Sequence, residues 1–160
     1  MKIEESVYIA PGAKVIGDVD IKENSSIWFN AVIRGDSNYI IIGKNSNIQD
    51  NVVIHTSSNC SVEIGDNVTI GHGSIIHGCK IGNNVLIGMG AIILDGVIIE
   101  DNCIIGAGSL VAQNKIIASE SLGFGNPFVR KRLVTEQEKK HILENAEKYV
   151  IEAKEYKNKN

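Results

Sequence analysis

The 160-residue sequence predicts an all-β protein with a C-terminal helix, and the β part predicts a parallel β-helix of six-residue repeats. Three observations point to this fold: the composition, a period of six residues, and turn-forming residues at fixed places in that period. Ile occurs 27 times and Val 14 times, whereas aromatic residues make up only 5% of the chain. Because β-branched residues favour strands and the core must be aliphatic, this composition favours stacked short strands.

Ile or Val recurs at every sixth position, with three interruptions. The pattern has eighteen such anchor positions, and chance would fill all of them with Ile or Val with a probability on the order of 10⁻¹¹. An α-helix repeats every 3.6 residues and a hairpin protein has turns every 8–12, whereas three short strands per coil explain a period of six. At three anchors per coil we expect about six coils. The anchors are Ile9, Val15, Ile21, Ile27, Ile33, Ile42, Ile48, Ile54, Ile64, Ile70, Ile76, Ile81, Ile87, Ile93, Ile99, Ile105, Val111 and Ile117.

Turn-forming residues lie between the anchors. Asn-rich pairs such as Asn83-Asn84 are placed where the chain must bend, and both Asn and Gly tolerate the positive φ of tight turns. This pattern predicts a corner after each short strand. Glycine directly follows the anchor at Gly43, Gly65, Gly71, Gly82, Gly88 and Gly106.

The repeat ends near residue 121, where the composition changes. We expect residues 1–121 to form the β-helix, residues 122–134 a connecting turn, and residues 135–157 an α-helix packed on the β-helix. Thr135 and Glu138 have the spacing of a capping box at the start of this helix. Its apolar residues recur at helical spacing and are expected to cover a face or edge of the coil. They are Ile142, Ala146, Tyr149, Val150 and Ala153.

Charge and cysteine content restrict the class of protein. A net charge of −3 argues against a nucleic-acid partner, because phosphate binding needs a concentrated basic surface. The opening residues MKIEE reach acidic side chains without a long apolar run, so we expect no signal peptide. No segment is apolar enough to span a bilayer, so we expect no membrane anchor. Three cysteines without a CxxC pair predict reduced thiols and a cytoplasmic location.

The three interruptions of the repeat bracket three of the four histidines. Ile33 and Ile42 are nine residues apart, Ile54 and Ile64 ten, and Ile76 and Ile81 five. Insertions in a solenoid form loops, often on its functional face. The histidines in this region are His55, His72 and His77.

These histidines predict a metal site shared between subunits. His55 and His77 each follow the third anchor of their coil, so they are expected to stack on one face within reach of one ion. His72 lies near a corner and is expected to point elsewhere. Three imidazoles with an open fourth position are typical of a catalytic zinc site. One ion can collect all three only if His72 comes from a neighbouring subunit, and a cyclic trimer suits three-sided prisms. The alternative is that all three are ordinary surface histidines.

Three segments resemble the γ-class carbonic anhydrases, and the resemblance covers nearly the whole chain. They are SIWFNAVIRGD (26–36), IGKNSNIQDNVVIH (42–55) and IGHGSIIHGCKIG (70–82). The resemblance implies a left-handed β-helix, a homotrimer, and zinc held by His55 and His77 of one subunit and His72 of its neighbour. The implied reaction is reversible hydration of CO₂ to bicarbonate, with zinc lowering the pKa of its bound water to about 7 so that hydroxide is available. Fe²⁺ or Co²⁺ can accept the same imidazole ligands.

The resemblance also implies roles for polar residues near the histidines. Gln49 matches the active-site glutamine of the family and is expected to orient the zinc-bound water, with Asn47 fixing the geometry beside it. Arg34 and Asp36 match the RxD pair of the family, and Asp50 matches a neighbouring aspartate. We expect these three charged residues to form an ion-pair network that supports the trimer.

Two residues of the C-terminal helix, Asn145 and Tyr149, are candidates to support the metal site if the helix crosses it. The alternative for Tyr149 is simple packing on an amphipathic helix. His141 is expected to be a solvated helix residue, and Cys79 a residue of the coil rather than a ligand.

Two departures from the family pattern keep other functions open. The family has a glutamate directly after its RxD pair where this chain has Ser37, and its acidic loop is replaced here by TSSNCSVE (56–63). Acidic groups there are associated with the proton transfer that turnover needs, so the sequence leaves open whether hydration is fast or absent. The alternatives are a hexapeptide-repeat acyltransferase that uses acyl-CoA, which shares the fold, and a catalytically weak metal-binding scaffold.

Overall fold

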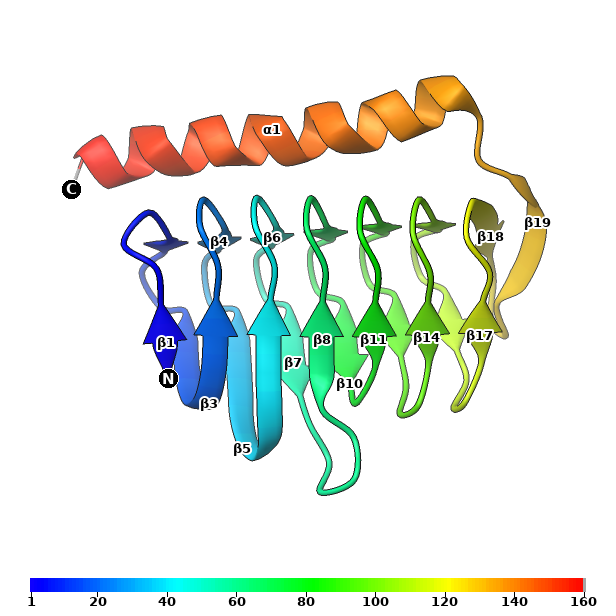
Figure 1. Cartoon of the computed structure of the whole chain (residues 1–160), viewed down its shortest axis with the longest axis horizontal. Helices are drawn as coiled ribbons and strands as arrows, with labels where there is room; N and C mark the ends of the chain where they lie inside the picture. The colour runs from blue at the N-terminus through cyan, green and yellow to red at the C-terminus, as the bar shows by residue number, and fades with distance from the viewer. Residues whose placement is uncertain (160) are drawn as a thin grey trace.

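The computed structural model describes residues 1–159 and shows a left-handed parallel β-helix followed by one long α-helix. The solenoid makes about seven turns (Figure 1). The count exceeds the six that eighteen anchors suggest, because strands at both ends extend the coil beyond the repeat: Lys2–Ile3 before it and Ser121–Phe124 after it.

One face of the prism, which we call the helix face, lies beneath the C-terminal helix. Its strands pair in parallel in the order of the coils. They are β2 (Tyr8–Ile9), β4 (Ser26–Ile27), β6 (Asn47–Ile48), β9 (Thr69–Ile70), β12 (Leu86–Ile87), β15 (Ile104–Ile105) and β18 (Ser121–Phe124). β19 (Val129–Leu133) pairs antiparallel with β18, so a hairpin occupies most of the segment expected to be a connecting turn.

The other two faces are joined because two long strands, β3 (Lys14–Ile21) and β5 (Val32–Ile42), run around a corner of the prism. The face that contains the starts of β3 and β5 is called the histidine face. It continues through β7 (Val53–His55), β10 (Ile75–His77), β13 (Ile92–Ile93) and β16 (Leu110–Val111). The third face contains β1 (Lys2–Ile3), the ends of β3 and β5, β8 (Val62–Ile64), β11 (Lys80–Ile81), β14 (Ile98–Ile99) and β17 (Ile116–Ile117).

The core consists of the aliphatic anchors, which stack from coil to coil. Ile21, Ile27, Ile33 and the anchors that follow them are almost completely buried. Ile9 differs: it is 38% exposed, because the first coil has no preceding coil to cover it. Since each buried Ile contributes roughly 1.5–3 kcal/mol relative to an exposed one, the stack of anchors is the main stabilising feature of the solenoid.

The three interruptions of the repeat take different structural forms. The first is spanned by β5, which continues around the corner with a shift in register beside Gly17. The second is a loop that leaves the coil after His55 and is closed by a bridge between Ser57 and Cys60. The third is a tight corner in which Gly78 adopts a φ of +53°.

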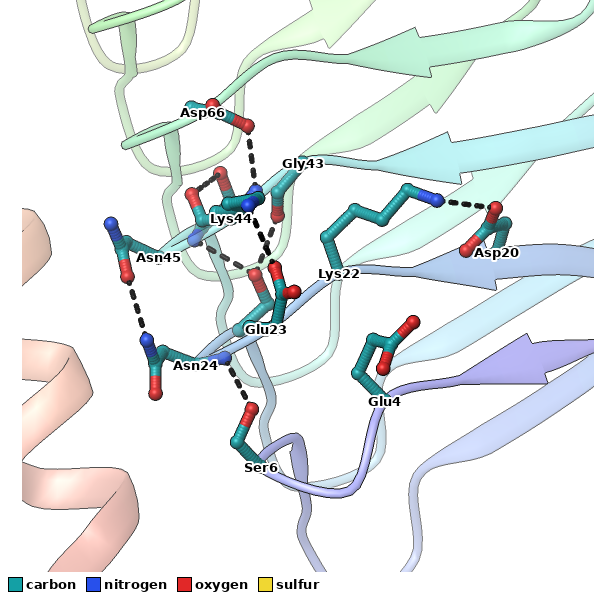
Figure 2. Close-up of polar contacts among 12 residues, drawn as sticks. Glu4, Ser6, Asp20, Lys22, Glu23, Asn24, Gly43, Lys44, Asn45 and Asp66 are labelled. Atoms are coloured by element: carbon teal, nitrogen blue, oxygen red, sulfur yellow. Dashed lines mark hydrogen bonds and ion pairs between the residues drawn. The ribbon is translucent and has the colours of Figure 1, made fainter.

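Asparagine ladders hold the corner between the third face and the helix face. Each ladder residue has a positive φ. The side-chain amide of Asn24 donates to the side-chain carbonyl of Asn45 in the next coil (Figure 2), and that of Asn45 donates to Asn67 in the same way. Beside it, Asp66 accepts a hydrogen bond from the backbone N–H of Lys44 at 2.7 Å. The turn residues therefore act as cross-coil fasteners as well as bends.

The C-terminal helix, α1 (Glu136–Lys159), runs back along the helix face toward the first coil (Figure 1). The capping box is confirmed: Thr135 N–H donates to Glu138, and Glu138 N–H donates to the Thr135 hydroxyl. Ile142, Ala146 and Ala153 are its buried residues. The helix is not apolar enough to cross a membrane, and no other helix occurs in residues 1–159.

An aromatic cluster fixes the second half of α1 to the first coils. Trp28 meets Tyr149 and Tyr156 edge-to-face, with ring centroids 5.5 and 5.4 Å apart. Tyr8 and Phe29 complete the cluster. Such pairs add about 0.5–1.5 kcal/mol each beyond the area they bury, so this contact determines where the helix lies.

Candidate metal centre

His55 and His77 form one half of the candidate centre. They end β7 and β10 and lie directly opposite each other in the parallel register. The preceding anchors Ile54 and Ile76 are buried, and side chains alternate along a strand, so both imidazoles point outward. Nδ1 of His55 is 3.1 Å from Nε2 of His77. The structure thus brings two imidazole nitrogens together at the corner between the histidine face and the third face.

This nitrogen pair fits a tetrahedral zinc ion. With Zn–N distances of about 2.0–2.1 Å, two ligand nitrogens at the tetrahedral angle are about 3.3 Å apart. The observed 3.1 Å separation is close to this value. Imidazole nitrogens are also the donor type that zinc, iron and cobalt accept. The two histidines are therefore suited in chemistry and in spacing to hold a metal ion.

Carboxylates contact both of these histidines. Asp36 Oδ1 is 3.0 Å from His55 Nε2, and its other oxygen is 2.5 Å from Arg34. The hydrogen bond from Arg34, and next the one from His55, lowers the pKa of Asp36. Asp95 pairs with Nδ1 of His77, and this hydrogen bond lowers the pKa of Asp95. Both carboxylates are thereby kept ionised beside the imidazoles.

His72 lies at the other edge of the histidine face, at the corner after β9. Its Nδ1 is 2.8 Å from Asp50 Oδ2, and its backbone N–H donates to Gln49 Oε1 at 3.1 Å. Gln49 Nε2 in turn donates to Asn47 Oδ1 at 3.0 Å. Gln49 and Asn47 are both buried, so the glutamine amide is held in a defined orientation beside His72.

The C-terminal helix reaches this second half of the centre through Asn145. Its amide and that of Asn47 both donate to the Thr69 hydroxyl at 2.9 Å. Tyr149 packs on Trp28, and burial is the main cause of its raised pKa, with the charges of Glu152 and Asp50 adding to it. Asn145 is therefore connected to Gln49 by hydrogen bonds, whereas Tyr149 is held by aromatic packing.

A single chain does not unite the two halves. His72 precedes β10 and His77 ends it, so the two histidines lie at opposite edges of the histidine face. Residues 1–159 of one chain contain no group of three His, Cys, Asp or Glu side chains placed to hold a metal ion. Arg34 and Asp50 likewise lie in different halves: Arg34 pairs with Asp36, and Asp50 with His72. Cys79 is buried in the coil, and His141 is exposed on α1.

Asp95 and an apolar row on the histidine face were not predicted from the sequence. Asp95 lies at the same corner as Gly78, one coil beyond His77, and this position relative to the anchors was the available signal. The apolar row occupies the outward position just before each anchor of the face, and its central members Val53 and Ile75 are 40% and 41% exposed. The row consists of Val32, Val53, Ile75, Ile92 and Leu110.

Comparisons with known proteins agree with this fold. The family model described as "Bacterial transferase hexapeptide (six repeats)" matches residues 1–35 and 78–113, and the model described as "Hexapeptide repeat of succinyl-transferase" matches residues 39–77. A solved structure of a hexapeptide transferase family protein from Anaplasma phagocytophilum superposes with a TM-score of 0.93 at 41% identity, covering 97% of this chain and 92% of that one. The chain is thus a hexapeptide-repeat β-helix protein.

Two curated relatives show to which family of hexapeptide-repeat proteins the chain belongs. "Probable carbonic anhydrase" of Methanocaldococcus jannaschii is 55% identical, over 92% of this chain and 93% of that protein. "Gamma carbonic anhydrase 2, mitochondrial" of Arabidopsis thaliana is 43% identical over 92% of this chain, which spans 55% of that protein's length. This chain belongs to the γ-class carbonic anhydrase family. The Arabidopsis protein is mitochondrial by name, and the cytoplasmic location expected for this chain stays a prediction.

Proposed function

We propose that this chain is a metal-dependent carbonic anhydrase that forms homotrimers and catalyses reversible hydration of CO₂ to bicarbonate. The observation that carries this proposal is the division of the three histidines between the two edges of one face. His55 and His77 present a nitrogen pair 3.1 Å apart at one edge, and His72 lies at the other. In a cyclic trimer of three-sided prisms, opposite edges of neighbouring subunits meet, so each interface completes one site.

The apolar row on the histidine face supports association through this face. The matching outward positions of the third face are mixed: Glu63 and Lys80 form an ion pair, whereas Ile98 and Ile116 are exposed. Val53 and Ile75 are partly exposed in the single chain and lie between the two halves of the centre. Packing them against a neighbouring subunit would bury apolar surface, and each Å² buried would stabilise the trimer by about 25 cal/mol. The same contact would bring His72 toward the histidine pair of that neighbour.

The residues of this chain would hold the metal and prepare the site for the reaction. Zinc in a three-histidine site supplies a bound water whose pKa is near 7. Gln49 presents an amide whose orientation is fixed by Asn47 and by the backbone of His72, so it would align a small polar molecule beside the metal. The helix supports this alignment through Asn145. Arg34 and Asp36 would hold His55 at the interface.

Metal analysis together with stopped-flow CO₂ hydration tests the proposal. The protein is purified both in air and anaerobically, since iron in such a site oxidises, and its oligomeric state is measured by light scattering. We expect a trimer with about one zinc or iron per chain and measurable hydration. His72→Ala should lose tightly bound metal and hydration together. His141→Ala is the matched control, because His141 is exposed on α1 away from both halves, and it should keep both properties.

Three results would contradict the proposal, and the first two identify the alternatives. A trimer with full metal but no hydration would point to a metal-binding scaffold, in agreement with Ser37 and the short loop after His55. Thiol release from acetyl-CoA by protein that holds no metal would point to an acyltransferase. A monomer that binds metal tightly would exclude a site shared between subunits.

A further inference from the structure

Asp95 is the residue near the candidate centre that neither the sequence pattern nor the family resemblance assigned a role. It lies at the corner after β13, one coil beyond His77, and its carboxylate pairs with Nδ1 of His77. Its side chain is 27% exposed, the lowest value among the three aspartates that contact the histidines. The hydrogen bond with His77 is the main cause of the lowered pKa of this carboxylate, and Ser57, in the loop that follows His55, lowers it further. Asp95 therefore interacts with His77 and with the segment that follows His55.

The local backbone leaves room for this carboxylate. Residue 78 is a glycine with a φ of +53°, and a Cβ at that position would be 2.5 Å from Asp95 Oδ1. Any larger residue would displace the carboxylate from His77. The contact between Asp95 and His77 therefore depends on a glycine at position 78.

The chemistry of imidazole gives this contact a specific consequence. In neutral histidine one ring nitrogen carries the proton and the other has the lone pair that binds a metal. An ionised carboxylate only accepts hydrogen bonds, so Asp95 keeps the proton of His77 on Nδ1. The lone pair is then on Nε2, the nitrogen that faces His55 at 3.1 Å.

The geometry points to Asp95 as a positioning residue that fixes the tautomer and ring orientation of His77 so that Nε2 is available to the metal. This inference rests on the proposed metal site. The other two histidines also meet carboxylates, but Asp36 is shared with Arg34, and Asp50 lies in the other half of the centre. In metal sites generally, the loss of such a carboxylate weakens metal binding by about 10- to 100-fold.

Two measurements on the metal-free and metal-titrated protein test this role. Long-range ¹H–¹⁵N NMR of ¹⁵N-histidine-labelled, metal-free protein should show His77 of the wild type protonated on Nδ1, and Asp95→Ala should give a mixture of tautomers. Zinc affinity, measured by competition with a chromophoric chelator, should fall about 10- to 100-fold in Asp95→Ala. Asp101→Ala is the matched control: its carboxylate caps Asn83 N–H at another corner, so the tautomer and zinc affinity should not change.

The outcomes separate this role from the proposed function. Wild-type zinc affinity and an unchanged tautomer in Asp95→Ala would overturn the role of Asp95 and leave the proposed function intact. Zinc binding that depends on Asp95 in a protein without CO₂ hydration would overturn the proposed function and leave this role intact. If Asp95→Ala does not fold, the wild-type spectrum alone decides, because a His77 protonated on Nε2 contradicts the inference.

Discussion

Asn67 shows how a single residue serves two purposes in the corner of the solenoid. Its φ is +56°, a region that most side chains avoid at a cost of about 1–2 kcal/mol. Its side chain also accepts a hydrogen bond from Asn45 and donates one to Asn84, at 3.1 and 3.0 Å. Asparagine is suited to this position because it tolerates the backbone conformation and its amide can both donate and accept.

Comparing Asn67→Ala with Asn67→Gly separates these two purposes. Both variants lose the two side-chain hydrogen bonds, each worth about 0.5–1.5 kcal/mol. Only the alanine variant adds the cost of a positive φ. We expect Asn67→Ala to be less stable than Asn67→Gly by about 1 kcal/mol in urea denaturation, although glycine normally destabilises regular structure. An alanine variant as stable as the glycine variant would contradict this account.

At the scale of elements, the start of α1 depends on one carboxylate. Glu138 accepts hydrogen bonds from Thr135 N–H at 2.9 Å and from both terminal nitrogens of Arg132 at 2.8 Å. The hydrogen bonds from Arg132, followed by the backbone hydrogen bond from Thr135, lower the pKa of Glu138 from 4.5 to about 2. A carboxyl whose pKa is depressed by folding stabilises the fold above its unfolded pKa and loses that contribution as the pH falls.

This contribution of Glu138 should disappear between about pH 4.5 and pH 2. Glu138→Gln keeps a capping side chain but cannot ionise, so wild type should be the more stable protein at pH 6. The difference in unfolding free energy should shrink steadily as the pH falls from about 4.5 toward 2. Denaturant titrations at several pH values, with the exposed Glu155→Gln as control, measure it. A difference that stays constant down to pH 3 would contradict the assignment.

The sequence predicted the elements wherever a period or a cap specified them. The six-residue spacing of buried anchors such as Ile54 and Ile76 fixed the coil, and Thr135 with Glu138 located the start of α1. The additional turn was not predicted, because the strands at the two ends that form it fall outside the repeat. The aromatic contact of Trp28 with α1 joins residues more than a hundred positions apart, and no period connects them.

The candidate site was predictable to the extent that it depends on register. The positions of His55 and His77 directly after their anchors predict that the two lie opposite each other, and the register agrees. The contacts of Asp36, Asp50 and Asp95 with the imidazoles could not be predicted from positions relative to the anchors. They depend on which way a corner side chain turns toward the next coil, and this is set by local features such as the glycine at position 78.

At the scale of the whole molecule, the proposed site exists only between subunits, and this can be tested by mixing two inactive chains. The first chain carries His72→Ala and keeps the histidine pair. The second carries His55→Ala and His77→Ala and keeps His72. On the proposed arrangement, neither chain alone can complete a metal site. A trimer that contains both chains has one interface at which the intact pair of the first chain meets the intact His72 of the second.

The arithmetic of random assembly makes the expectation quantitative. When the two chains are refolded together at equal concentration, about three quarters of the trimers contain both chains, and each of these has one complete site out of three. Metal content and CO₂ hydration should therefore recover to about one quarter of the wild-type values, while each chain refolded alone stays near zero. A shared interface is required for recovery, so a site built within one chain would give no recovery on mixing. Light scattering of the mixture confirms that trimers have re-formed, which makes the absence of recovery in such trimers evidence against the shared site.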